Sequence, residues 1–101
     1  MILLIFFDLP RHSKEERNEA SKFRKHLISL GFIMKQYSVY ERPIQRLETR
    51  NKIFEDIAKH LPKKGSISLY ELPDYVNEKQ MTLRGKNIII KANKKPSLIV
   101  L

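Results

Sequence analysis

One acidic residue stands at the end of a strongly apolar segment near the start of the chain. Asp8 follows Ile2–Phe7 and precedes Pro10, a residue that removes a backbone donor and fixes φ, so we predict a buried strand that ends in a turn. A carboxylate there can hold Mg²⁺, which prefers oxygen ligands; it can equally cap backbone N–H groups of the turn. No second acid is obviously placed to share a metal, although a twofold dimer would bring two copies of Asp8 together.

Basic residues follow this turn and return in one later loop. They are placed to contact phosphates, but they could also form a solvated helix face that pairs with Glu15, Glu16 and Glu19. The candidate nucleic-acid-binding residues are Arg11, Lys14, Arg17, Arg24, Lys25, Lys63 and Lys64.

The histidines and tyrosines suggest weaker possibilities for chemistry. His12, His26 and His60 show no metal-ligand spacing; His12 could shuttle a proton near Asp8 or be an ordinary exposed loop residue. The strand tyrosines could stack on bases or serve core packing; they are Tyr37, Tyr40 and Tyr70. The sequence contains no glycine-rich phosphate loop, no Ser-His-Asp order and no zinc pattern.

Composition narrows the class of protein. The 101 residues carry 20 Lys and Arg against 11 Asp and Glu, a net charge of +9, which is a plausible footprint for phosphate backbones. The stretch 82–101 contains five basic residues and no acid. The absence of cysteine excludes disulfides and thiolate metal sites and suits a reducing cytoplasm. The longest apolar segment is too short to span a membrane, so we expect no membrane association.

The strongest secondary-structure signal is a helix over Ser13–Leu30. Ser13 and Glu16 form a capping box at its start, and Gly31 is a suitable stop. Its apolar stripe comprises Ala20, Phe23, Leu27 and Leu30.

The remaining elements follow from the alternation of apolar runs with proline and glycine. We predict a strand over 32–42 with an unresolved bulge or reversal near 36–38, a helix over 45–61, a strand over 66–72, a helical turn within 74–80, and strands over 86–92 and 97–101. The inward face of the second helix is predicted to be Leu47, Phe54, Ile57, Ala58 and Leu61.

This order predicts a single α+β domain over 1–101, a ferredoxin-like βαββαβ sandwich with an additional C-terminal strand. Both helices would cover one face of the sheet, and the tail or a second subunit would cover the other. Because an apolar final strand would otherwise leave an open edge, we expect residues 97–101 to pair with a dimer partner.

Five segments in this order and spacing closely resemble the small CRISPR-associated endoribonuclease family, the second universal spacer-acquisition protein, in the form found beside single-effector systems. The resemblance runs from Met1 to about Leu72 and is loose beyond Pro73. The segments that carry it are Ile5–Pro10, Lys14–Arg17, Lys22–Lys25, Gly31–Tyr40 and Pro62–Ile67.

The resemblance implies a cytoplasmic homodimer that bridges integrase dimers and carries protospacer DNA, with Mg²⁺-dependent nuclease activity on RNA or double-stranded DNA in some members. Asp8 matches the family's metal-binding and catalytic aspartate. Phe7 stands where tyrosine is common, so any role for that hydroxyl is lost. Arg17 and Arg24 match basic positions of the first helix, and Tyr40 matches an aromatic of the second-strand motif.

Two function classes remain open at this stage. One is a bridging subunit whose catalysis is vestigial, and the other is a phosphodiesterase in which paired Asp8 side chains hold Mg²⁺. A third alternative is a stand-alone toxin-like ribonuclease or a non-catalytic RNA-binding domain on the same fold.

Overall fold

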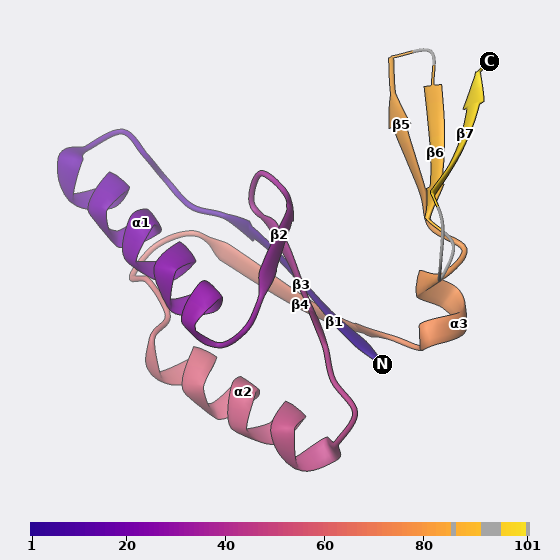
Figure 1. The fold of residues 1–101 in the computed structure, drawn as a ribbon. Coiled ribbons are helices and arrows are strands. Elements are labelled where there is room, and N and C mark those ends of the chain that lie inside the picture. Colours follow the sequence, from indigo (N-terminus) through magenta and orange to yellow (C-terminus); the bar gives the residue numbers. More distant parts are fainter. Residues whose placement is uncertain (86, 92–95, 101) are drawn as a thin grey trace. The chain divides into compact units, whose positions relative to one another are not determined.

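The computed structural model describes residues 1–85, 87–91 and 96–100, and it divides the chain into two units, Met1–Glu71 and Leu72–Leu101. In the first unit the elements are β1 (Ile2–Asp8), α1 (Lys14–Ser29), β2 (Ile33–Gln36), β3 (Val39–Pro43), α2 (Leu47–Lys59) and β4 (Ser66–Leu72). The sheet order is β2-β3-β1-β4, with β1 and β3 antiparallel and in the centre. This arrangement confirms the predicted βαββαβ sandwich (Figure 1).

Alternation along β1 places the hydrophobic core on one face of the sheet. Leu3, Ile5 and Phe7 are buried, and they share a core with residues of both helices, including Leu27 of α1 and Ile57 of α2. Both helices therefore lie on the same face (Figure 1). The even-numbered side chains of β1 point away from the helices, and Phe6 is exposed on the other face of the sheet.

Helix α1 begins and ends where its sequence predicts. The Ser13 hydroxyl accepts a hydrogen bond from the Glu16 N–H, and the Glu16 carboxylate accepts one from the Ser13 N–H, each at 3.0 Å. At the other end Gly31 has φ +91°, a conformation that glycine adopts without steric cost. The buried residues of α1, Ala20, Phe23 and Leu27, define the side that faces the sheet.

The long second strand is two strands separated by a reversal. Strands β2 and β3 pair with each other and are joined by Tyr37 and Ser38, and Ser38 has φ 66°. The register shifts between Met34 and Gln36, so both the irregularity and the reversal left open by the sequence are present. The reversal matters because it exposes Tyr37 at the tip of the hairpin.

The predicted inward face of α2 is wrong in part. Ile53 and Ile57 are buried, whereas Leu47 and Leu61 are 64% and 54% exposed and Ala58 is also exposed. At ~100° per residue, Leu47 and Ala58 point roughly 100° or more away from the direction shared by Ile53 and Ile57. Leu61 lies beyond the last helical residue. Phe54 packs against the core from the edge of this face.

The second unit contains α3 (Asp74–Asn77), β5 (Met81–Arg84), β6 (Asn87–Lys91) and β7 (Pro96–Val100). The helical turn was predicted within 74–80, and the bounds of the last two strands differ from the prediction by one residue at each end. Strand β5 was not predicted. Lys86, Ala92 and Leu101, which belong to the predicted strands, lie outside the described residues. The sheet order is β5-β6-β7, so β7 pairs with β6 of its own chain. The assignment of 1–101 to one domain and the exchange of 97–101 with a partner stay predictions.

Within the described ranges, no helix has both the length and the apolar character that crossing a membrane requires.

Candidate nucleic-acid interface and metal-ligand groups

Asp8 lies at a junction of three segments. It is the exposed last residue of β1. The preceding residue, Phe7, donates its N–H to the Ser38 carbonyl of the β2–β3 turn at 3.1 Å. On the other side Gly65 lies so close that a Cβ there would be 2.6 Å from the Asp8 carbonyl oxygen. The end of β1 is therefore held between the β2–β3 turn and the start of β4, and the carboxylate reaches solvent from a fixed backbone.

Beside this junction Arg11, Arg24 and Tyr37 form a group that we call the Tyr37 cluster. The Arg11 guanidinium donates a hydrogen bond to the Tyr37 hydroxyl and lies 5.4 Å from the ring centroid. The Arg24 guanidinium, from α1, lies 5.7 Å from the same centroid. Both contacts fall within the range of cation–π attraction. Tyr37 is 64% exposed, Arg11 is exposed and Arg24 is half-buried, so the cluster places two cations at the surface.

Arg17 supports the loop that carries this cluster. Its Nη1 donates to the backbone carbonyls of Arg11 and His12, at 3.3 and 3.4 Å. Because those carbonyls belong to the turn between β1 and α1, Arg17 restrains the backbone from which Arg11 projects. The side chain is exposed, so it adds positive charge as well.

The other predicted basic residues are more dispersed. Lys64 lies 3.9 Å from the Glu16 carboxylate with a side chain that is 74% exposed, a surface pair of little energetic weight. Lys14 and Lys25 are exposed on α1, and Lys63 is exposed in the loop before β4. The structure thus brings Arg11 and Arg24 together, supported by Arg17, and leaves the lysines as separate surface charges.

Glu16 is committed to the backbone at the start of α1. Hydrogen bonding from the Ser13 N–H is the main cause that lowers the pKa of the Glu16 carboxyl from its ordinary value; desolvation opposes this, and the His12 N–H and the Lys64 charge add to it. Glu16 therefore stays ionised and holds the turn that follows Asp8. Among the described residues, the Glu16 carboxylate contacts the start of α1 and Lys64 and not the Tyr37 cluster.

The aromatic candidates separate clearly by burial. Tyr40 is buried in the core and stacks on Phe7, with ring centroids 5.7 Å apart. Tyr70 is exposed and meets Phe6 edge to face at 5.5 Å. Only Tyr37 of the three predicted tyrosines contacts the cationic groups. In the sequence, the feature that could have indicated this role is the position of Tyr37 between two strand-forming segments. The reversal places that position at an exposed hairpin tip.

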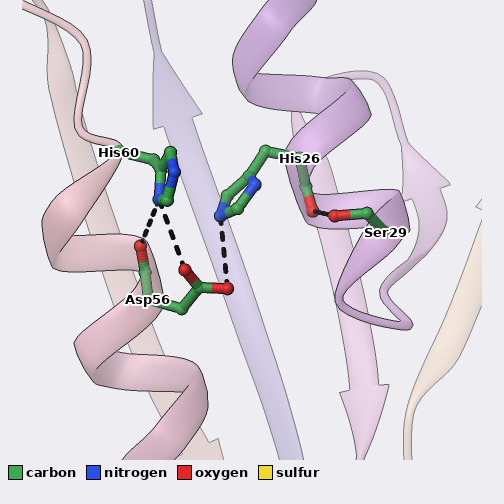
Figure 2. A network of polar contacts seen from close by, with 4 residues as sticks. All are labelled: His26, Ser29, Asp56 and His60. Carbon is green, nitrogen blue, oxygen red and sulfur yellow. Dashed lines mark hydrogen bonds and ion pairs between the residues drawn. The ribbon is translucent and has the colours of Figure 1, made fainter.

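A second group was not predicted. His26 of α1 meets Asp56 and His60 of α2, and the potential ligand atoms of the three all lie within 4.8 Å of one another. The Asp56 carboxylate is 3.6 Å from His26 Nε2 and 3.3 Å from His60 Nδ1 (Figure 2). Our statement that the histidines show no metal-ligand pattern is corrected for two of them: the helix pair, and not the sequence spacing, brings them together. Asp8 belongs to no such group among the described residues.

The comparisons with known proteins agree with this architecture. The family model of CRISPR associated protein Cas2 matches residues 1–80. The chain belongs to the Cas2 family. CRISPR-associated endoribonuclease Cas2 of Treponema denticola is 35% identical over 101 residues, covering 100% of both chains. The Ligilactobacillus salivarius protein of the same name is 42% identical over 88 residues, covering 87% of each chain.

A solved structure shows the same fold. The crystal structure of Streptococcus pyogenes Cas2 at pH 6.5 matches with a TM-score of 0.64 at 21% identity, covering 83% of this chain and 100% of that chain. This confirms the α+β fold with four antiparallel strands and additional C-terminal strand structure. The chain is thus a Cas2-family protein, in a family whose two relatives named above are endoribonucleases.

Proposed function

We propose that this Cas2-family protein is a spacer-acquisition subunit that dimerises, bridges two integrase dimers and holds protospacer DNA on its basic surface. The observation that carries the proposal is the Tyr37 cluster, which presents two guanidinium groups beside the exposed Asp8. Guanidinium groups suit phosphate contacts because their planar donors match phosphate oxygens. The segments that carry the family resemblance favour the form that works beside single-effector systems.

The proposed binding is to the phosphate backbone and nearly independent of sequence. Arg11 and Arg24 lie on the loop between β1 and α1 and on the surface of α1, positions that suit backbone contacts better than base edges in a groove. Replacing both by alanine should weaken duplex DNA binding and lower the slope of log K against log salt by about 2. Lys52 and Lys59 on α2 are exposed and supply a matched control that removes the same charge elsewhere.

The Arg17→Ala, Arg24→Ala pair separates support from contact. This double variant removes Arg24 from the Tyr37 cluster, and it also removes the hydrogen bonds by which Arg17 restrains the loop that carries Arg11. Binding should weaken and the salt slope should flatten. An unchanged slope in both double variants, together with a reduced slope in the lysine control, would place the DNA on a different surface.

The proposed dimer has its twofold axis near Asp8, with residues 97–101 pairing onto the partner. β7 lies at an edge of its sheet, so one side of the strand is available for further pairing. Truncation after Pro96 should raise the dimer dissociation constant in sedimentation equilibrium. A dimer of unchanged strength after truncation would remove the exchanged strand from the proposal.

Paired Asp8 side chains are also the proposed holders of Mg²⁺. One chain supplies one exposed carboxylate at this position, a ligand type that suits the ion, so the fit depends on the second copy. When bound, Mg²⁺ would supply Lewis acidity and an activated water for phosphodiester hydrolysis. Cleavage of RNA or duplex DNA should then require the ion and vanish in Asp8→Ala, while the dimer persists.

The deciding experiment separates bridging from hydrolysis. The protein is purified with its integrase, and spacer integration is compared between wild type and Asp8→Ala. Full integration by a variant that has lost cleavage would assign the function to bridging alone. Loss of co-purification with the integrase would contradict the proposal as a whole.

A further inference from the structure

The cluster His26, Asp56 and His60 lies outside the surface proposed for DNA. It joins the two helices that cover one face of the sheet: His26 is in the last turn of α1, and Asp56 and His60 are on α2 and its C-cap (Figure 2). Asp56 and His60 are four residues apart, a spacing that places two side chains on one helix face. The two imidazole rings face each other with centroids 3.9 Å apart.

One nitrogen atom of this cluster is buried without a hydrogen-bond partner. His26 Nε2 is buried and has no hydrogen-bond partner. Its distance of 3.6 Å to the Asp56 carboxylate is too long for a hydrogen bond. An unpaired buried polar atom costs stability, and here its lone pair is directed to the same region as a carboxylate and a second imidazole. A bound cation would satisfy all three groups at once.

The spacing of the ligand atoms fits a tetrahedral cation. With metal–ligand distances of about 2.0–2.1 Å, the edges of such a tetrahedron measure ~3.3–3.4 Å. The observed separations are 3.6 Å from Asp56 Oδ2 to His26 Nε2 and 3.3 Å from Asp56 Oδ1 to His60 Nδ1, and with one ligand atom per residue all three atoms lie within 4.8 Å of one another. Small side-chain rotations would therefore bring the three ligand atoms to the separations that a tetrahedral cation requires. Two imidazoles with one carboxylate favour Zn²⁺ and its neighbours in the transition series, whereas Mg²⁺ prefers oxygen ligands alone.

A fourth position is accessible from the surface. A pocket of about 220 Å³ opens beside the two rings; its lining includes Glu19, Lys22, His26 and His60. Water could occupy the remaining coordination position through this opening, as it does in zinc sites with three protein ligands. The ion would thus have both an entry path and room for an exchangeable ligand.

Metal binding through His60 Nδ1 would displace a proton. His60 Nδ1 lies 2.8 Å from the Asp56 backbone carbonyl, a distance at which the neutral ring donates its Nδ1 proton to that oxygen. Ligation through Nδ1 replaces this hydrogen bond and releases the proton; a ring flip would instead present Nε2. By either route the imidazoles must be unprotonated, so affinity should fall on acidification.

We propose that His26, Asp56 and His60 form a Zn²⁺ site that fastens α1 to α2. The site is complete within one chain, so it should bind one ion per chain whatever the oligomeric state. This stoichiometry distinguishes it from an ion shared by two Asp8 carboxylates, which would bind once per two chains. The inference does not depend on the proposed role in spacer acquisition.

The test is titration of metal-free protein with Zn²⁺, followed by calorimetry and by thermal unfolding. Wild type should bind one equivalent per chain, and its Tm should rise with Zn²⁺ concentration because the ion binds the folded state. His26→Gln, Asp56→Asn and His60→Gln should each weaken binding at least tenfold. The exposed His12 provides the control, since His12→Gln should bind as wild type does.

Two further measurements keep the result unambiguous. Circular dichroism of each variant without metal shows whether it folds, and Co²⁺ absorption in wild type should show the intense visible bands of a tetrahedral site. Mg²⁺ at the same concentration should leave Tm unchanged. Absence of a Zn²⁺-dependent Tm shift in wild type, or equal binding by the three variants and wild type, would overturn the proposal. Loss of binding in Asp8→Ala alone would move the ion to the other site.

Discussion

Arg11 and Arg24 share one aromatic ring although their charges repel. The Tyr37 face attracts both guanidinium groups, and the hydroxyl holds Arg11 by a hydrogen bond. Both cations therefore stand in fixed positions before a phosphate arrives, and a phosphate between them would relieve their repulsion. Because these side chains are already ordered before binding, the loss of conformational entropy on binding is smaller. In the proposed complex, the ring would act on DNA through the arginines that it positions.

This argument predicts a specific effect of Tyr37→Ala. DNA affinity should fall about 3- to 10-fold, because two weak cation–π contacts and one hydrogen bond no longer order the arginines. The salt slope should stay as in wild type, since no cation is removed. Fluorescence anisotropy across a salt series measures both. Tyr75→Ala, which removes another exposed tyrosine, is the control. A changed slope would mean that Tyr37 does more than position charge.

Gly65 packs directly against the backbone of Asp8. It has φ +102°, and a Cβ would lie 2.6 Å from the backbone oxygen of Asp8, which cannot move without shifting β1. Gly31 has a similar φ of +91°, but its added Cβ would meet the Arg42 side chain, which can rotate away. We expect Gly65→Ala to lower the free energy of unfolding by about 2–3 kcal/mol and Gly31→Ala by about 1 kcal/mol. Urea denaturation of both variants decides this; equal losses would contradict it.

At the scale of elements, local signals predicted well where they were self-contained. The Ser13–Glu16 capping box fixed the start of α1, and the apolar run of β1 fixed its central position. The inward face of α2 depended on which of two neighbouring stripes meets the sheet, and this is decided by packing against β1 and α1. Strand β5 was not predicted because Met81–Arg84 is short and mixed in polarity. Its strand conformation depends on pairing with β6.

The candidate site divides in the same way. Asp8, Arg11 and Arg24 could be singled out by charge and position, but no sequence pattern shows that two arginines meet on Tyr37. The His26 group is a stronger case, since its members lie on helices 30 residues apart in sequence and only the i, i+4 pair Asp56 and His60 is a local signal. Contacts between elements remain invisible until the elements are packed.

The start of α1 has a pH dependence that follows from Glu16. Its folded-state pKa lies below the ordinary 4.5, because backbone N–H groups stabilise the carboxylate. The stabilisation is therefore fully present above about pH 5 and is lost as the pH falls through the folded pKa. Gln can accept the same capping hydrogen bonds without charge. Wild type should exceed Glu16→Gln in stability at pH 7, and the difference should shrink steadily below pH 4.5. A difference independent of pH would contradict this account.

At the scale of the whole molecule, the sheet face opposite the helices of the first unit carries exposed apolar side chains. Phe6 and Tyr70 are 39% and 55% exposed and touch each other, and Ile33 is 64% exposed. Cross-strand register places Leu4 with Glu41 and Phe6 with Val39 on the same face. Burial of such a face against a second copy would remove apolar area from water, in keeping with the proposed homodimer.

The last prediction concerns this face. Phe6→Asp and Tyr70→Asp should each shift the protein from dimer to monomer at micromolar concentration, since either places a charge where an apolar surface would be buried. Circular dichroism should stay native, because both side chains project away from the core. Ile28→Asp is the matched control, since Ile28 is an equally apolar exposed residue on α1 and lies off this face. Sedimentation velocity reports the result. If the Phe6 and Tyr70 variants stay dimeric while Ile28→Asp becomes monomeric, the partner contacts the helices and the open sheet face has another role.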